Sequence, residues 1–356
     1  MGTTWHASVV WPTVAGHGDS QGLDSMDLAA SPEQLQQQIQ ADIEQLLDSI
    51  NAHMSTYDPS SALSLFNATT STDWIEQPAP VIELLRAAAD ISEQTQGAYD
   101  VTLGGLVDLW GFGKDGNPGR DYGQKVLPEQ VTTWMDKVGY HLLQYSDDNQ
   151  RLRKHVADLQ VDLSSIAKGY AVDKVGDMLE NMGIDRYLFE LGGEIRTRGQ
   201  AGDNSAWVIA LESPDPISLS TASGAQFSSS AVKAIGVENA HIATSGDYRN
   251  YREIDGKRIS HLIDGRTGYP VRNRLASVTV MHRSTVLADA WATAFMIVGA
   301  DRALAMAQSS GLAISLTLRE NSGFATRHSE AFDAYLHDVK PPRLSFTARL
   351  KSLFGS

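Results

Sequence analysis

Cysteine is absent from the 356 residues, and its absence excludes several kinds of chemistry. Without thiols the chain can form no disulfide, bind no metal through thiolates and use no thiolate nucleophile. Long apolar runs are missing as well, since no stretch approaches the roughly 18 uninterrupted apolar residues that a membrane-spanning helix needs. The first residues also lack a charged segment followed by an apolar one, so we expect no signal peptide within this sequence.

Positive charge is scarce. Lysine and arginine number 29 and aspartate and glutamate 43, which gives a formal net charge of −14. Proteins that bind nucleic acid present a basic stripe to the phosphate backbone, so we expect no nucleic-acid partner. A polyphosphate ligand would be repelled by the overall field. Backbone N–H groups, a few Lys or Arg side chains, or a metal ion would then have to supply a local attraction.

Several standard catalytic motifs are missing too. The sequence contains no phosphate-binding P-loop, no dinucleotide-binding G-x-G-x-x-G after a strand, no H-E-x-x-H zinc motif and no G-x-S-x-G nucleophile elbow. What is present is a 42% apolar composition, which is ample for a hydrophobic core. The function must therefore be sought in less familiar patterns.

Helical periodicity is clear in four segments. The run Ser31–Gln34 supplies an N-cap, a first-turn proline and a capping-box partner, and apolar residues then recur with the helical period as far as residue 54. Further helices are expected over 80–96, from just after 162 to near 183, and over 288–298, with a glycine at or near the end of each. Strand-like runs are expected at 3–10, 187–191, 207–211 and 276–280. The strands cluster instead of alternating strictly with helices, which favours an α+β fold.

Two segments have the composition of a ligand site. The segment 97–113 mixes glycines with aromatic residues, and it could pack against a flat ring, although a glycine-rich turn over a core is the commoner use. Ser164 and Ser165 stand where the third helix is expected to begin, with Lys168 one turn further on, which favours anion binding at a helix N-terminus. Simple helix capping by Asp162 and Ser164 is the alternative.

Two further patterns bear on metal binding and proton transfer. Asp289 and Thr293 lie four residues apart, hence on one helix face, and a carboxylate with a hydroxyl suits Mg²⁺, although such pairs are more often merely solvated. His261 precedes a turn at Asp264-Gly265. Its ordinary pKa of about 6.5 suits a general base, although a lone histidine beside a turn is more often structural.

Taken in this order, the segments resemble the ApbE-type flavin transferases, the FAD:protein FMN transferases. The resemblance covers roughly residues 1–335. It is carried by collinear motifs at Met1-Gly2-Thr3-Thr4-Trp5, Ser55-Thr56-Tyr57-Asp58, Leu65-Phe66-Asn67, Tyr99-Asp100-Val101-Thr102 to Trp110-Gly111-Phe112-Gly113, Asp162-Leu163 to Ala167-Lys168-Gly169, Glu190-Leu191-Gly192-Gly193-Glu194, Thr244-Ser245-Gly246 to Tyr248-Arg249-Asn250, Ser260-His261 to Gly268, and Ala288-Asp289-Ala290 to Thr293. It implies a single compact α+β domain over residues 1–335, with two mixed α/β lobes and the flavin cleft between them. A short basic amphipathic extension follows over residues 336–356.

The resemblance also assigns roles to residues. It implies that Mg²⁺ is held by the carbonyl of Ser165 and by Asp289 and Thr293. Some relatives carry a further carboxylate three residues after the metal-binding aspartate; here that position is Ala292, so a second metal ion would be held less firmly. The implied flavin contacts are Met1, Tyr57, Ala98, Tyr99, Asp100, Asp162, Lys168 and Ile263.

The implied activity is transfer of the FMN half of FAD onto a Thr or Ser hydroxyl of an acceptor flavoprotein. A phosphoester bond forms and AMP is released in a Mg²⁺-dependent reaction that needs mainly positioning and charge stabilisation. His261 is the candidate base for the acceptor hydroxyl, Asp264 is an alternative or orienting group, and Lys168 stabilises charge. Two alternatives stay open: a Mg²⁺-dependent FAD pyrophosphatase that yields FMN and AMP, and a non-catalytic FAD-binding protein.

The resemblance finally suggests partners and a location. The expected acceptors are subunits of Na⁺-pumping NADH:quinone reductase or of Rnf-type complexes, with the target in a Gly-Ala-Thr or Gly-Ala-Ser context. Relatives are commonly exported lipoproteins. We therefore expect this protein at the periplasmic face of the inner membrane, touching the membrane only through a lipid anchor whose signal is not in this sequence.

Overall fold

The computed structural model describes the chain over residues 2–11, 31–113, 126–211, 234–247, 251–254 and 257–336. Three parts of the predictions lie outside these described residues: Met1, the Tyr248-Arg249-Asn250 end of one motif, and residues 337–356 of the predicted extension. The chain divides into two compact units. Within the described residues, the first unit contains residue 2 and residues 31–113, 126–171, 251–254 and 257–272. The second unit contains residues 3–11, 172–211, 234–247 and 273–336.

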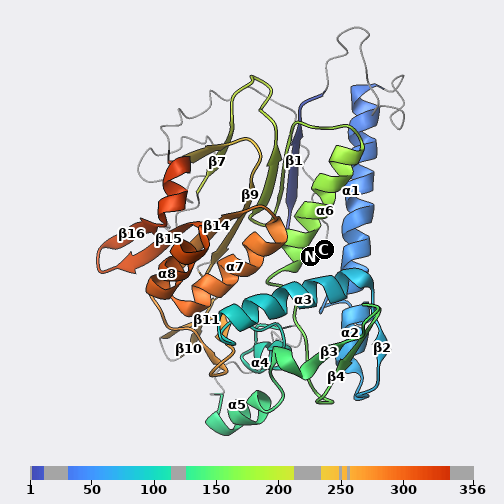
Figure 1. The fold of residues 1–356 in the computed structure, drawn as a ribbon, viewed down its shortest axis with the longest axis vertical. Coiled ribbons are helices and arrows are strands. Elements are labelled where there is room, and N and C mark those ends of the chain that lie inside the picture. Colours follow the sequence, from blue (N-terminus) through green and yellow to red (C-terminus); the bar gives the residue numbers. More distant parts are fainter. Residues whose placement is uncertain are drawn as a thin grey trace. The chain divides into compact units, whose positions relative to one another are not determined.

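The first unit is built mainly from helices, with three small sheets (Figure 1). Its helices are α1 (Pro32–Met54), α2 (Ala62–Ala68), α3 (Ala79–Gln94), α4 (Gly104–Leu109), α5 (Pro128–Met135) and the 3-10 turn η1 (Tyr140–Leu142). A three-stranded sheet has the order β2 (Ile75–Glu76), β4 (Arg151–Lys154), β3 (Leu143–Tyr145). Two further strand pairs are β10 (Tyr251–Ile254) with β11 (Lys257–Ser260) and β12 (Ile263–Asp264) with β13 (Tyr269–Pro270).

The second unit is organised around a seven-stranded sheet in which all neighbouring strands are antiparallel. The strand order is β1 (Trp5–Val9), β5 (Tyr187–Leu191), β6 (Glu194–Arg198), β9 (His241–Gly246), β14 (Leu275–His282), β15 (Ala313–Glu320), β16 (Gly323–His328). A separate pair joins β7 (Trp207–Ala210) to β8 (Ala234–Val237). The remaining elements are α6 (Ala167–Asn181), which begins in the first unit, α7 (Thr285–Val298), α8 (Ala300–Ser310) and the 3-10 helix η3 (Glu330–Tyr335).

Local sequence explains where α1 and α7 begin or end. The Ser31 hydroxyl accepts a hydrogen bond from the Gln34 N–H, and the Gln34 side chain accepts one from the Ser31 N–H, which is the predicted capping box. Helix α7 ends before Gly299, whose φ of 84° lies in the left-handed region that favours glycine. Both predicted helices are therefore confirmed, and α7 begins three residues earlier than the sequence indicated.

The core of the second unit lies on both faces of its sheet. Seven of the eight residues of β14 are buried, so side chains of both alternating sets are covered. Met281 of β14 and Ile242 of β9 pack with Trp207, Ile235 and other apolar residues of β7, β8 and η3. Helix α7 also contacts β9 and β14, and it is buried almost all round. This burial fixes the register of α7, which carries the predicted metal-binding residues.

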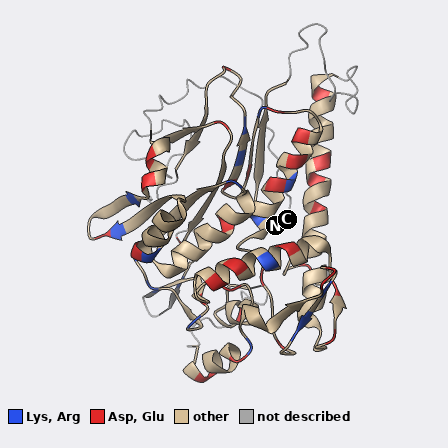
Figure 2. Cartoon of the chain, in the orientation of Figure 1, with Lys and Arg blue, Asp and Glu red and all other residues tan. Residues whose placement is uncertain are grey.

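The predicted α+β class is confirmed, because each unit mixes helices with sheets. The predicted strands match β1, β5, β7 and β14 within a few residues. Acidic residues recur along α1, α3 and α6 in Figure 2. Of the described helices, none is both long and apolar enough to cross a membrane.

Candidate functional site

Tyr57 presents an aromatic ring at the surface of the first unit. The residue stands between α1 and α2 and is 69% exposed. Its pKa lies above the ordinary value because part of the phenol is desolvated and because the Asp162 and Asp108 carboxylates are near. An exposed, flat and apolar ring close to the Asp162 segment is suited to packing against a planar ligand.

The segment containing the predicted contacts Ala98, Tyr99 and Asp100 is itself buried. The Tyr99 hydroxyl lies 2.9 Å from the Ser165 hydroxyl oxygen. The Asp100 carboxylate accepts hydrogen bonds from the N–H and hydroxyl of Thr102 and from the Tyr140 N–H, at 2.7–2.9 Å. Burial raises the pKa of Asp100, and these donors act against that increase. The side chain of Asp100 thus fixes its own loop, and the Tyr99 hydroxyl links this loop to Ser165.

The turn after His261 is fastened to the same loop. The Gly265 N–H donates to the Ala98 carbonyl at 2.9 Å. A Cβ atom at Gly265 would collide with the carbonyl oxygen of Gly97, so the close approach of the two chain segments requires glycine there. The predicted contact Ile263 is 3% exposed and packs in a cluster with residues of α4 and α5. Its side chain is therefore part of the core that supports this turn.

His261 and Asp264 have different surroundings. The His261 ring is half-buried and meets the Phe112 ring edge-on, with centroids 6.2 Å apart. Asp264 instead accepts two hydrogen bonds from the guanidinium of Arg266, at 2.9 and 2.6 Å, which raise the pKa of Arg266. Both carboxylate oxygens of Asp264 are thus engaged in an ion pair. This pairing weighs against Asp264 as the proton acceptor, and the role of His261 as the base stays a prediction.

Asp162 precedes a turn, and α6 begins only at Ala167. The Asp162 carboxylate accepts a hydrogen bond from the Ser164 N–H at 2.8 Å, and the N–H groups of Ile166 and Ala167 donate to the Leu163 carbonyl. The sequence analysis placed the start of this helix just after Asp162. The Asp162 side chain instead closes a turn, and the helix begins after that turn, at Ala167. The observed hydrogen bond of Asp162 closes a turn ahead of α6 and is not a helix cap. Lys168 is the second residue of α6 and is half-buried.

The predicted metal-binding pair lies on α7 in the second unit. Asp289 is 2% exposed and Thr293 is 9% exposed. The Thr293 hydroxyl oxygen lies 3.0 Å from that of Ser245 on β9. A buried carboxylate needs a cation or hydrogen-bond donors nearby, and a carboxylate with hydroxyl oxygens is the donor set that hard cations prefer, so these residues fit Mg²⁺.

The third predicted ligand, Ser165, belongs to the first unit, and its pairing with Asp289 stays a prediction. In the parts of the chain that the structure describes, no three or more His, Asp or Glu side chains group as a metal site. The predicted set has a single carboxylate and would not form such a group.

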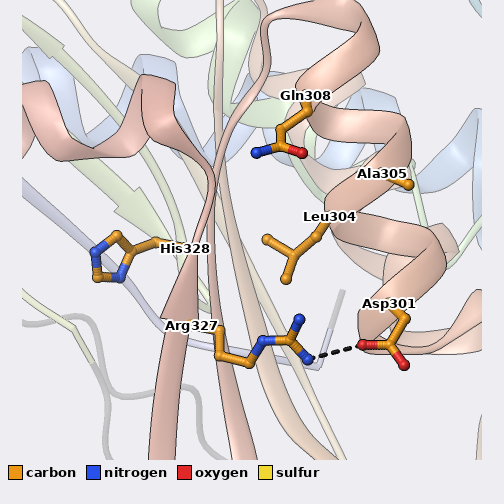
Figure 3. Close-up of a pocket in the computed structure, with 6 residues that line it drawn as sticks. All are labelled: Asp301, Leu304, Ala305, Gln308, Arg327 and His328. Atoms are coloured by element: carbon orange, nitrogen blue, oxygen red, sulfur yellow. Dashed lines mark hydrogen bonds and ion pairs between the residues drawn. The ribbon is translucent and has the colours of Figure 1, made fainter.

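A surface pocket of about 560 Å³ lies between α8 and β16 in the second unit. In Figure 3 Arg327 reaches across to Asp301, and their side-chain atoms are 2.8 Å apart. The Nε2 atom of His328, at the side of the pocket, lies 3.1 Å from a carboxylate oxygen of Asp333. None of the predicted site residues lines this pocket, so it is separate from the candidate site.

The sequence analysis gave no role to two charged residues that the structure places in hydrogen-bond networks, the half-buried Asp173 and the buried Lys154. Asp173 of α6 accepts hydrogen bonds from the N–H groups of Thr285 and Val286 at the start of α7. Lys154 of β4 is 0% exposed. The alternation of β4 places Lys154 on the same inward face as Leu152, and this was the one signal in the sequence that could have found it.

Comparisons with known proteins match the chain along most of its length. The sequence profile of the ApbE family matches residues 1–316. The FAD:protein FMN transferase of Haemophilus influenzae is 38% identical over 335 residues, which are 93% of this chain and 88% of that protein. Among solved structures, the flavin transferase ApbE of Vibrio cholerae is similar with a TM-score of 0.77 and 34% identity, over 94% of this chain and 96% of that one. The apo flavinyl transferase ApbE of Pseudomonas stutzeri gives 0.75 and 33%, over 94% and 98%.

Proposed function

From its membership of the ApbE family of flavin transferases, which makes the chain a transferase, we propose that it moves the FMN half of FAD onto an acceptor flavoprotein. The proposed acceptor group is a Thr or Ser hydroxyl. The reaction requires Mg²⁺ and releases AMP. The observation that carries the proposal is the joining of separate predicted flavin contacts within the first unit. The Tyr99–Ser165 and Ala98–Gly265 contacts hold three chain segments together beside the turn that follows His261.

The charge of the chain favours a role for a local cation in binding FAD. The net charge of −14 repels a pyrophosphate, and backbone donors with one lysine offer limited compensation. Asp289 and Thr293, with the Ser165 carbonyl, are the residues that we propose to hold Mg²⁺. Bound there, the ion would neutralise the pyrophosphate and the charge that develops on AMP. Lys168 would add to that stabilisation.

The chemistry requires one proton acceptor and one leaving group. We propose that His261 removes the proton from the acceptor hydroxyl, whose oxygen forms a new bond to the FMN-side phosphorus. The bond from that phosphorus to the bridging oxygen breaks, and AMP leaves with the electron pair. We assign the base to His261 and not to Asp264, because the Asp264 carboxylate is paired with Arg266. We expect general-base assistance to contribute about 10²–10⁴-fold to the rate.

Intact-mass measurement of an acceptor protein is the direct test. The chain is incubated with FAD, Mg²⁺ and a subunit of a Na⁺-pumping NADH:quinone reductase or an Rnf-type complex that carries the target hydroxyl. A mass gain equal to one covalently bound FMN, with AMP in solution, is the expected result. Free FMN without a mass gain would favour the pyrophosphatase instead, and FAD that stays bound and uncleaved would favour a binding protein.

The proposed location is the periplasmic face of the inner membrane, through a lipid anchor, and it rests on the resemblance alone. Expression of the complete gene product, followed by membrane fractionation and labelling with a radioactive fatty acid, tests it. Recovery of unlabelled protein in the cytoplasmic fraction would contradict this proposal and would leave the enzymatic one untouched.

A further inference from the structure

Lys154, the last residue of β4, is a fully buried lysine in the first unit. Its ammonium donates to the carbonyl oxygens of Phe66 and Leu159, at 3.2 and 3.1 Å, and lies 3.5 Å from that of Asn67. Lysine is almost never fully buried unless it is paired, because removing the charge from water is costly. In the described part of the chain its hydrogen-bond partners are carbonyl oxygens, and burial lowers the pKa of Lys154.

These carbonyl groups come from two segments that are distant in the sequence. Phe66 and Asn67 stand at the C-terminal end of α2, where carbonyl groups lack partners within the helix. Leu159 belongs to the segment that leads to Asp162. The ammonium therefore links the end of α2 to this segment.

Asn67 strengthens the same link. Its side-chain amide donates to the Val161 carbonyl at 2.8 Å, and its side-chain oxygen accepts from the Val161 N–H at 2.8 Å. The two bonds together satisfy both backbone groups of Val161, which is 0% exposed. Asn67 lies in one of the motifs that carry the family resemblance, and the sequence analysis gave it no role.

The opposite side of this segment contacts the loop that contains the buried predicted flavin contacts. The Asp162 N–H donates to the Val101 carbonyl at 2.8 Å, and the Gly104 N–H donates to the Gln160 carbonyl at 3.2 Å. Residues 159–162 thus run between the end of α2 and residues 101–104. Of the predicted flavin contacts, Tyr57 precedes α2, residues 98–100 precede Val101, and Asp162 ends the segment itself. This one segment therefore connects these three groups of contacts.

We propose that Lys154 and Asn67 are positioning residues for FAD binding: they hold residues 159–162 in place and so set the relative positions of the flavin-binding segments. This inference rests on the proposed function. Neither residue is among the predicted flavin contacts. Removing the ammonium leaves buried carbonyl groups without a donor, and the segment shifts to satisfy them. FAD must then restore the binding conformation, and its affinity falls by that free-energy cost.

The expected effect is a change in FAD affinity with little change in the chemical step. For Lys154→Met, which removes the charge and keeps a long side chain, we expect the Kd and KM for FAD to rise about tenfold, with kcat at saturating FAD within about threefold of wild type. Asn67→Ala should act in the same direction. In the double variant the two effects should not add, because both residues act through the same segment.

The experiment uses the full chain and two independent readouts. Quenching of flavin fluorescence gives the Kd for FAD without an acceptor, and FMN transfer at varied FAD gives KM and kcat. The matched control is Phe332→Leu, a fully buried core residue that belongs to the second unit, whereas residues 159–162 belong to the first. Thermal unfolding midpoints show how much stability each variant has lost.

The outcomes separate positioning from general stability. A raised Kd in the Lys154 and Asn67 variants, with a wild-type Kd in an equally destabilised Phe332→Leu, supports the proposal. A wild-type Kd in folded Lys154→Met, or an equal rise in the control, overturns it. If Lys154→Met does not fold, Asn67→Ala and the milder Asn67→Asp decide by the same criterion. Wild-type protein that binds FAD and transfers no FMN would overturn the proposed function, while the comparison of Kd values would still stand.

Discussion

Lys154 in the first unit and Asp173 in the second are held by their surroundings in opposite ways. In the first unit the Lys154 ammonium is surrounded by neutral carbonyl groups, and burial lowers its pKa. In the second unit the Asp173 carboxylate is surrounded by hydrogen-bond donors, and its pKa is lowered to about 2. The same direction of shift has opposite meanings, since a lowered pKa disfavours the charged form of a lysine and favours that of an aspartate.

Asp173 shows how a half-buried charge can be stabilised within the fold. Burial alone would raise its pKa, and hydrogen bonds from His241, Thr285 and Val286 reverse that effect. The donors are the His241 ring at 3.0 Å and the two N–H groups at the start of α7, at 3.1 and 3.2 Å. Ser284, the N-cap residue of α7, makes no side-chain capping bond to its own helix and donates to Asp173 instead. A residue of α6 thus caps α7.

The difference suggests a division of labour. The network around Lys154 leaves its charge partly uncompensated, and it joins short segments of the predicted flavin site. The network around Asp173 is strongly stabilising, and it anchors the helix that carries Asp289 one turn further on. Changes at the predicted metal and base residues should therefore affect turnover, whereas changes at Asp173 should affect stability.

The largest expected effect is the loss of FMN transfer when Asp289, in the second unit, is replaced. We expect Asp289→Ala to lower Mg²⁺-dependent FMN transfer by roughly 10³-fold or more, because the Mg²⁺ that neutralises the pyrophosphate would lose its only predicted carboxylate ligand. The rate is measured across a Mg²⁺ titration. Asp301→Ala, which removes an exposed acid of α8, is the control and should behave as wild type. Full activity of Asp289→Ala in EDTA would remove the metal from the mechanism.

The next largest expected effect is slower FMN transfer when His261, in the first unit, is replaced. His261→Ala should slow transfer by about 10²–10⁴-fold with FAD affinity near normal, because general-base assistance is lost and no predicted flavin contact changes. Single-turnover transfer and the Kd for FAD are the measurements, with His155→Ala, an exposed histidine, as the control. Unchanged turnover at saturating FAD and acceptor would show that another group accepts the proton.

Local patterns in the sequence predicted the helix ends and the position of the proposed metal-binding pair on one helix face. They could not predict contacts between residues that are distant in the sequence. The capping box at Ser31 and the glycine after α7 are set by residues within one helical turn, and the shared face of Asp289 and Thr293 follows from their spacing. The contact of Asp173 with Thr285 joins residues 112 positions apart, and that of Tyr99 with Ser165 joins residues 66 apart. Such contacts depend on how whole elements pack, which no local pattern records.

Lys154 shows a different limit. The alternation of β4 pointed it inward, but the preference of lysine for solvent pointed it outward. Only the carbonyl groups from α2 and from residue 159 resolve this conflict, and their positions depend on the tertiary fold. A buried charge is therefore hard to predict from sequence, because its stabilising partners come from elsewhere in the chain.

Replacing Asp173 should lower the free energy of unfolding moderately, by an amount that depends on pH. Its folded pKa of about 2 lies below the ordinary value of 3.8, so its contribution is fully present above about pH 4 and is lost as the pH falls through about 2. The shift corresponds to about 2 kcal/mol. Asp173→Asn should lose roughly this stability at pH 7 and flatten the acid limb between about pH 4 and 2. Urea unfolding at a series of pH values tests this, and an unchanged acid limb would contradict it.

The smallest expected effect is the alkaline counterpart at Lys154. The pKa of this lysine is lower in the folded protein than its ordinary value of about 10.4, so between these two values the unfolded chain binds more protons. In that pH interval the free energy of unfolding of wild type should therefore rise with pH relative to that of Lys154→Met. Urea midpoints of the two proteins, compared from neutral to alkaline pH, measure the difference. If the difference in urea midpoint does not change with pH, the carbonyl groups stabilise the ammonium as well as water does. The contrast between Lys154 and Asp173 would then disappear.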